Sequence, residues 1–180
     1  TPMTDALAFS GLQHMKEALL PVSTTEGIDL HHRAAMAYGA LLSGITLANA
    51  GLGVVHGLAG SLGGLMEIPH GLVCGLLVGP ATAMNIRFLE RQNDESSTAL
   101  RKYARVGHLL RNSGAEDVEQ GCRFLIEELK NWKDQLALPA PGSLEIAPAQ
   151  LDETARLSGN KNNPVQLEEE DRRELLRLCL

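Results

Sequence analysis

The chain has few cysteines, and the three that it has do not form a cross-linking or zinc-binding pattern. Cys74, Cys122 and Cys179 are odd in number, far apart and without any C-x-x-C pair in 180 residues. Disulfide-stapled secreted domains use an even, closely spaced set, and structural zinc sites use paired cysteines. The pattern argues against both classes and predicts a reducing, cytoplasmic location.

A concentration of basic residues is also lacking. The 16 Lys and Arg residues are scattered along the chain and are outnumbered by 22 Asp and Glu residues, which gives a net charge of −6. A protein that follows nucleic-acid phosphates or binds an anionic membrane needs a gathered basic surface. The sequence therefore predicts neither a nucleic-acid partner nor a membrane-surface partner.

The opening TPMTDALAFS contains neither a secretory signal nor an initiator methionine. We therefore expect the sequence to be part of a longer polypeptide. With 44% hydrophobic residues, 180 residues suffice to bury one core, so a single domain over residues 1–180 is expected.

Charged side chains are absent from residues 34–66, so a membrane-spanning helix has to be weighed against buried helices. The length is adequate, because a span needs about 20 apolar residues. Polar residues such as Ser43 and Asn49 make the run only weakly hydrophobic, and the glycines in 51–53 should interrupt a helix. We therefore predict core helices and no membrane partner.

Strand alternation is missing as well, and helical periodicity replaces it. Apolar residues recur at spacings of three and four from Val118 to Leu136, and S-x-x-E motifs at 23–26 and 113–116 are typical of helix starts. The sequence predicts an all-α, multi-helix bundle. We expect helices over residues 4–20, from the first S-x-x-E motif to about 50, over 69–89, from a cap at Asn93 and Asp94 to about 111, and over 113–136, 150–157 and 167–178. Pro21 should end the first of these helices, and residues 51–64 should form only short helical turns.

Several catalytic motifs are absent. GLGVVHG at 51–57 follows no strand and so is not a phosphate-binding loop, and the sequence contains neither H-E-x-x-H nor G-x-S-x-G. Ser61 lacks the glycine two positions before it that a nucleophile elbow requires. A serine hydrolase and a zinc protease are therefore not expected.

Two histidines stand among glycines and aliphatic residues. His56 and His70 are fourteen positions apart, with the carboxylate of Glu67 between them. Each taken alone is more simply explained as a neutral core imidazole with satisfied nitrogens. Glycines that break the helix and Pro69 before His70 favour their convergence, and imidazole is a common ligand of transition metals. The pair is our candidate metal site, and none of the other four histidines offers a convincing third ligand.

The stretch N-x-G-L-G-x-V-H-G-x-A at 49–59, then P-H-G at 69–71 and an apolar segment with Pro80 and Asn85, resembles the iron-containing (group III) alcohol dehydrogenases. PMTDALA near the start and GNKNNPVQL with EDRRELL near the end are similar to the same family. The resemblance covers most of the chain. It implies the dehydroquinate synthase-like, helical C-terminal domain of such an enzyme, without its N-terminal nucleotide-binding α/β domain.

In that family a D-x-x-x-H pair and two later histidines bind a divalent metal, and the later two match His56 and His70. The resemblance implies Fe²⁺, with Zn²⁺ as the alternative, and NAD or NADP bound mainly by the missing domain. It also implies metal-assisted hydride transfer between small alcohols and carbonyl compounds in the full-length enzyme. No D-x-x-x-H pair occurs in this sequence; the residue four positions after Asp5, for example, is Phe9. We therefore expect the isolated 180 residues to be inactive.

Two positions depart from the family pattern. Gly60 stands where many relatives have a histidine that faces the substrate pocket, and Leu47 stands where some have an aromatic residue. The resemblance therefore predicts neither the substrate nor further catalytic residues for this chain, and a homo-oligomer remains an alternative to a monomer. The alternatives are a glycerol-dehydrogenase-like or dehydroquinate-synthase-like zinc enzyme domain, and a non-catalytic helical interaction module with two satisfied core histidines.

Overall fold

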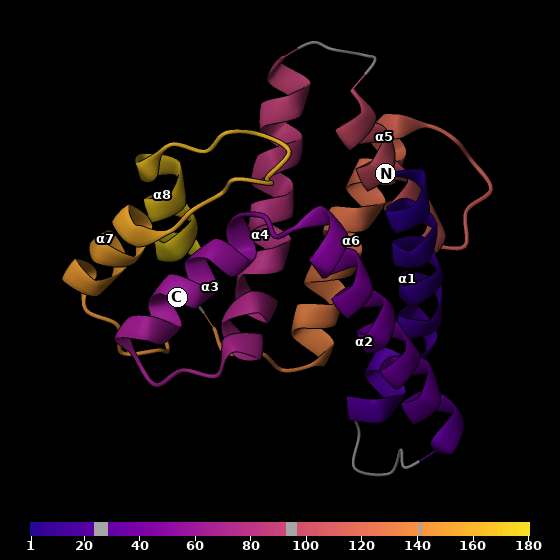
Figure 1. The fold of residues 1–180 in the computed structure, drawn as a ribbon, viewed down its shortest axis with the longest axis horizontal. Helices are drawn as coiled ribbons and strands as arrows, with labels where there is room; N and C mark the ends of the chain where they lie inside the picture. The colour runs from indigo at the N-terminus through magenta and orange to yellow at the C-terminus, as the bar shows by residue number, and fades with distance from the viewer. Residues whose placement is uncertain (24–28, 93–96, 141) are drawn as a thin grey trace. The chain divides into compact units, whose positions relative to one another are not determined.

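The computed structural model describes residues 1–23, 29–92, 97–140 and 142–180, and over these residues it contains helices and no strand (Figure 1). The prediction of an all-α protein is confirmed. The helices are α1 (Pro2–Ser23), α2 (Leu30–Ala50), α3 (Val54–Leu65), α4 (His70–Arg91), α5 (Thr98–Leu110), α6 (Val118–Gln135), α7 (Pro148–Leu157) and α8 (Glu169–Cys179). The chain forms two compact units, residues 1–51 with 101–136 and residues 52–100 with 137–180.

The first unit contains α1, α2, α6 and most of α5, and glycines allow its helices to approach closely. Helices α1 and α2 pack side by side, and a Cβ added at Gly11 would lie 3.5 Å from Cβ of Leu42. A Cβ added at Gly107 of α5 would overlap the carbonyl oxygen of Gly121 in α6. Only residues without a side chain permit this backbone-to-backbone crossing.

The second unit contains α3, α4, α7 and α8, with α4 as its central helix. Helix α3 packs on α4 and α7, and α8 packs on α4 and α7. The buried residues of α4 are Val73, Leu76, Leu77, Ala81, Thr82, Met84, Asn85, Ile86 and Leu89. They lie at helical spacing along the side that meets the neighbouring helices, as expected for an amphipathic core helix.

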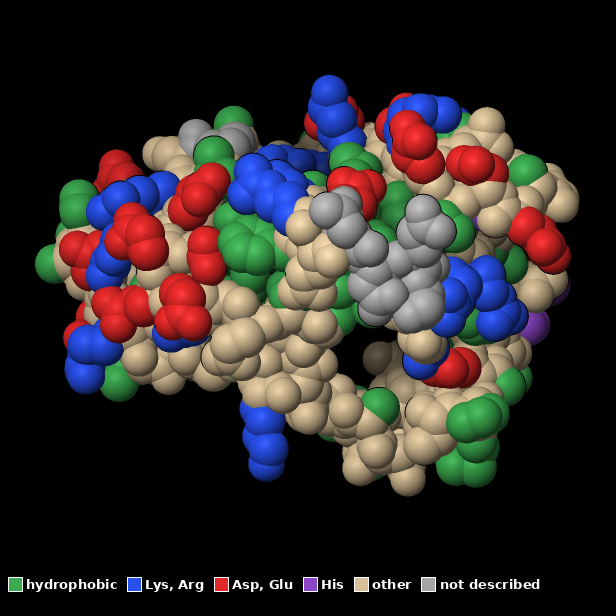
Figure 2. Space-filling view, turned by 90° about the horizontal axis from the view of Figure 1, so that it is seen from above, with side chains coloured by type: hydrophobic (Ala, Val, Ile, Leu, Met, Phe, Trp, Pro, Cys, Tyr) green, Lys and Arg blue, Asp and Glu red, His purple; other side chains and the backbone are tan. Residues whose placement is uncertain are grey.

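Charges on α7 and α8 are mixed in sign. Figure 2 shows acidic and basic side chains interleaved over these two helices, and Arg173 of α8 pairs with Asp152 of α7 at 2.8 Å. Within α8, Arg173 also pairs with Glu169 at 2.7 Å. A surface of this kind presents no continuous basic face to a polyanion, in agreement with the scattered Lys and Arg of the sequence.

One described helix, α4, is long and apolar enough to cross a membrane, and the count rises to two if α2 and α3 are taken as one span. Since nine residues of α4 are buried, its apolar character is that of a core helix.

An amide pair ties the start of α3 to α4 and to the segment before α8. Asn163 donates from Nδ2 to Oδ1 of Asn85 (2.8 Å) and to the carbonyl oxygen of Val165 (2.9 Å). Its own Oδ1 accepts from Nδ2 of Asn85 (3.2 Å) and from the backbone N–H of Val54 (3.3 Å). Asn85 is 4% exposed, so water cannot readily replace these bonds.

Asn163→Ala is expected to lower the free energy of unfolding by roughly 2 to 3 kcal/mol, because several partly buried hydrogen bonds are lost together. Urea denaturation followed by circular dichroism measures the change. Asn162→Ala is the matched control, since Asn162 is exposed and should shift stability by less than about 0.5 kcal/mol. Equal effects of the two substitutions would contradict the role given to the amide pair.

Several predicted boundaries differ from the observed ones. Helix α1 continues through Pro21 to Ser23, because proline has a helical φ and removes only one hydrogen bond in the last turn. Residues 54–65 form one helix in place of short turns. Helix α6 begins at Val118, where Asp117 accepts from the N–H of Gln120 (2.5 Å), and not at Ser113. Most of the first S-x-x-E motif, and the predicted Asn93 and Asp94 cap, lie outside the described residues.

Candidate metal centre

The connection between α3 and α4 determines where the two histidines lie. Helix α2 ends at Ala50, and its C-cap residue Gly51 has a φ of 75°. Helix α3 begins at Val54, so His56 is in its first turn. Pro69 precedes α4 with a φ of −56°, and His70 is the first residue of that helix. Glycine and proline thus set the two helix starts from which the imidazoles project.

The two imidazoles converge within the second unit. Nδ1 of His56 lies 3.1 Å from Nε2 of His70, and the ring planes are stacked with an angle of 25° and centroids 5.3 Å apart. The Sγ atom of Cys74, one helical turn after His70, lies 3.4 Å from Nε2 of His70 and 3.7 Å from Nδ1 of His56. Among the described residues these three side chains form a cluster of metal-ligand type.

Burial differs across the cluster. His56 and Cys74 are half-buried, whereas His70 is exposed. Burial, with a smaller contribution from the adjacent His70, lowers the pKa of His56, because both disfavour the charged imidazolium. Burial raises the pKa of the Cys74 thiol for the corresponding reason. At neutral pH His56 is therefore a neutral imidazole, the form that offers a lone pair.

The nitrogen separation fits a common cation. Nitrogen ligands bind a divalent metal at about 2.0–2.1 Å, so two that share an ion at tetrahedral or octahedral angles lie about 2.9–3.4 Å apart. The observed 3.1 Å is within that interval. The same contact would also suit a single hydrogen bond in which one imidazole N–H donates to the other ring.

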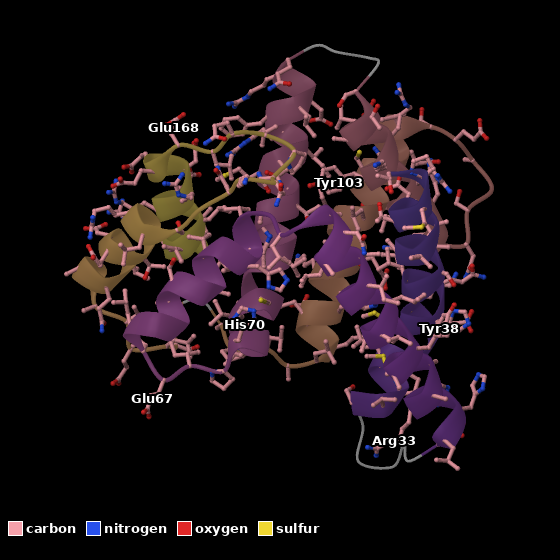
Figure 3. The ribbon with its side chains drawn as sticks, in the orientation of Figure 1. Arg33, Tyr38, Glu67, His70, Tyr103 and Glu168 are labelled. Carbon is pink, nitrogen blue, oxygen red and sulfur yellow. The ribbon has the colours of Figure 1, made fainter. Side chains whose placement is uncertain are left out.

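The structure brings together the two predicted ligands and leaves the nearby carboxylate apart. Glu67 is exposed on the connection between α3 and α4, and Figure 3 shows its side chain directed away from that of His70. No other histidine belongs to the described cluster; His14, for example, contacts the carbonyl oxygen of Ser10 at 2.8 Å.

Cys74 was not among the ligands predicted from the sequence, because the three cysteines were compared with one another and not with the histidines. The signal was present, because Cys74 follows His70 by four residues and residues four apart on a helix lie on the same face. An H-x-x-x-C pair is thus comparable to the H-x-x-x-H pairs that bind metals from one helix.

Three glycines that follow His56 on α3 face open space. A Cβ added at Gly60, Gly63 or Gly64 would meet no atom within 4 Å. Gly60, one turn after His56, is exposed. A side chain at position 60 would therefore contact no other described residue of the chain.

Comparison with known protein families gives a match over nearly the whole chain. The family described as Fe-containing alcohol dehydrogenase, C-terminal, matches residues 1–179. The 1-propanol dehydrogenase of Citrobacter freundii is 31% identical over 137 residues, which are 76% of this chain and 35% of that protein. The NAD-dependent methanol dehydrogenase of Bacillus methanolicus is 34% identical over 86 residues, 48% of this chain and 22% of that protein.

Solved structures show the same fold. A halo-thermophilic archaeal alcohol dehydrogenase from a Red Sea brine pool superposes with a TM-score of 0.86 at 26% identity, over 99% of this chain and 45% of that one. A 1,3-propanediol oxidoreductase gives a TM-score of 0.86 at 24% identity, over 100% and 46%. The chain therefore spans less than half the length of each of these relatives.

Proposed function

Because the chain belongs to the iron-containing alcohol dehydrogenase family, we propose that it is the metal-binding, helical C-terminal domain of an NAD(P)-dependent oxidoreductase that interconverts alcohols and carbonyl compounds. The convergence of Nδ1 of His56 and Nε2 of His70 at 3.1 Å is the observation that carries the metal-binding role. The relatives are more than twice as long, which supports an additional N-terminal nucleotide-binding domain. We also propose that residues 1–180 form one helical domain and that the protein is located in the cytoplasm.

The chemistry follows from the donor atoms. A divalent metal bound by these residues supplies a Lewis acid, which lowers the pKa of an alcohol hydroxyl and so favours hydride transfer to a nicotinamide ring. His56 and His70 would hold the ion through imidazole nitrogens and are not needed as general bases. Gly60, Gly63 and Gly64 leave room beside His56 for a small alcohol to approach. The remaining ligands would come from the D-x-x-x-H pair that the resemblance places upstream.

Two alternatives make different predictions. A non-catalytic helical module would keep His56 and His70 as a hydrogen-bonded pair and would bind no metal. A zinc enzyme of the glycerol-dehydrogenase or dehydroquinate-synthase type would bind metal but would not oxidise simple alcohols. The similarity to a methanol dehydrogenase and a 1-propanol dehydrogenase favours a small-alcohol substrate over both.

The full gene product, including any sequence upstream of Thr1, is expected to contain about one Fe²⁺ or Zn²⁺ per chain and to reduce NAD or NADP with methanol, 1-propanol or 1,3-propanediol. Metal analysis and nicotinamide absorbance measure the two properties. Residues 1–180 alone should show no turnover, because the nucleotide domain and two ligands are missing. A metal-free, inactive full-length protein would refute the proposal, as would turnover by residues 1–180 alone.

A further inference from the structure

Cys74 is a sulfur donor at the edge of the proposed histidine site, and it is not among the residue types that the family resemblance assigns to the metal. We propose that its thiolate binds the same ion as His56 and His70, so that the ligand set contains sulfur and favours Zn²⁺ over Fe²⁺. This inference rests on the proposed function, because it concerns the same ion.

The distances are those of a shared ligand sphere. Zinc binds sulfur at about 2.3 Å and nitrogen at about 2.0–2.1 Å, which places the two donors about 3.1–3.6 Å apart at angles of 90° to 110°. Sγ of Cys74 lies 3.4 Å from Nε2 of His70 and 3.7 Å from Nδ1 of His56. The two nitrogens are themselves 3.1 Å apart. The longer of the two sulfur–nitrogen distances corresponds to an S–metal–N angle of about 116°, so the three separations are compatible with one shared ion.

Helix α4 fixes this arrangement. His70 and Cys74 are four residues apart, so their side chains project from the same face one turn apart. His56 approaches from α3, which packs against α4 in the same unit. Two helices thus present three donors from backbone segments that pack together, and such preorganisation is what a metal site requires.

Cys74 differs from the other two cysteines of the chain. Cys122 and Cys179 are 2% and 1% exposed and belong to helix cores, whereas Cys74 is half-buried beside an exposed histidine. An ion can therefore reach Cys74 from solvent. As the Sγ–metal bond forms, the S–H bond breaks and its proton passes to water, so one proton is released for each ion bound.

A thiolate changes which metal is preferred. Thiolate ligands are soft and are typical of zinc sites, whereas Fe²⁺ is harder and the divalent affinity series already places Zn²⁺ above it. Adding a thiolate to the two imidazole nitrogens widens that difference. The presence of Cys74 therefore predicts a zinc-preferring site within a family named for iron.

Cobalt(II) titration of the metal-free full gene product, under reducing and oxygen-free conditions, tests this ligand set. The wild-type chain should develop the near-ultraviolet thiolate-to-cobalt charge-transfer absorption. Cys74→Ser and Cys74→Ala should abolish that absorption and weaken Co²⁺ binding by about tenfold or more. With equal Fe²⁺ and Zn²⁺ in competition, both variants should also show a lower ratio of bound zinc to bound iron than the wild type.

Cys122→Ala is the control for loss of a thiol, and it should retain the absorption band. Circular dichroism establishes that each variant is folded. Absence of the band in the wild type, its persistence in Cys74→Ser, or no cobalt binding would overturn the role of Cys74. His56→Ala and His70→Ala separate the two proposals. If they weaken cobalt binding and the Cys74 variants do not, only the Cys74 inference fails, whereas unchanged binding in the histidine variants counts against the proposed function as well.

Discussion

His70→Ala in the full gene product is expected to lower kcat/KM for alcohol oxidation by at least about a hundredfold and to remove most of the bound metal. Outer-shell partners of metal ligands already contribute about 10–100-fold, so a direct ligand contributes no less. The Lewis acid supplies several kcal/mol of charge stabilisation that no other group in the described cluster can replace. Metal analysis and steady-state kinetics with a nicotinamide cofactor measure both effects.

The folded structure should survive this substitution, because His70 is exposed and belongs to no apolar core. His31→Ala is the matched control, since His31 is also exposed and occupies the first turn of its helix, α2. That control should retain metal and activity. Full metal content and unchanged activity in His70→Ala would show that His70 is not a metal ligand, and would contradict the prediction.

The convergence of His56 and His70 could be anticipated because it depends on local rules. Glycines at 51–53 interrupt the chain, and Pro69 fixes the start of the next helix. Both effects act within a few residues and are visible in the sequence. The distance between the nitrogens could not be anticipated, because it depends on how α3 packs on α4. The same packing brings Sγ of Cys74 near His56, eighteen positions away.

The helix boundaries likewise depend partly on local sequence and partly on tertiary packing. Residues 54–65 contain four glycines, which by propensity alone favour short turns over a helix. The helix forms because Val54, Leu58, Ala59 and Leu62 are buried at helical spacing, and this tertiary gain exceeds the propensity cost. At α6, two polar residues compete for the helix start. Asp117 caps the helix, while Oγ of Ser113 accepts from the N–H of Ala115 in the preceding turn (3.3 Å).

Gly57→Ala is expected to destabilise the metal-free chain by about 2 to 3 kcal/mol, although alanine is the better helix former. A Cβ at position 57 would overlap the carbonyl oxygen of Gly159 and lie 3.0 Å from its carbonyl carbon. Neither atom belongs to a flexible side chain, so the backbone of α3 or of the segment after α7 must move. Overpacking typically costs about 1–3 kcal/mol, and an overlap with backbone atoms lies at or above the upper end of that range. After the helix-propensity gain of about 1 kcal/mol is subtracted, a net loss of about 2 kcal/mol or more remains.

Gly60→Ala, a substitution on the same helix, is expected to stabilise the chain instead. No atom lies within 4 Å of a Cβ at position 60, so only the propensity gain remains, and stability should rise by about 0.5–1 kcal/mol. Urea denaturation of both variants measures the contrast. Destabilisation by both substitutions would show that α3 resists any side chain, and stabilisation by both would show that α3 and Gly159 are not in backbone contact. Because Gly57 adjoins His56, its displacement should also weaken metal binding, whereas Gly60→Ala should leave binding intact.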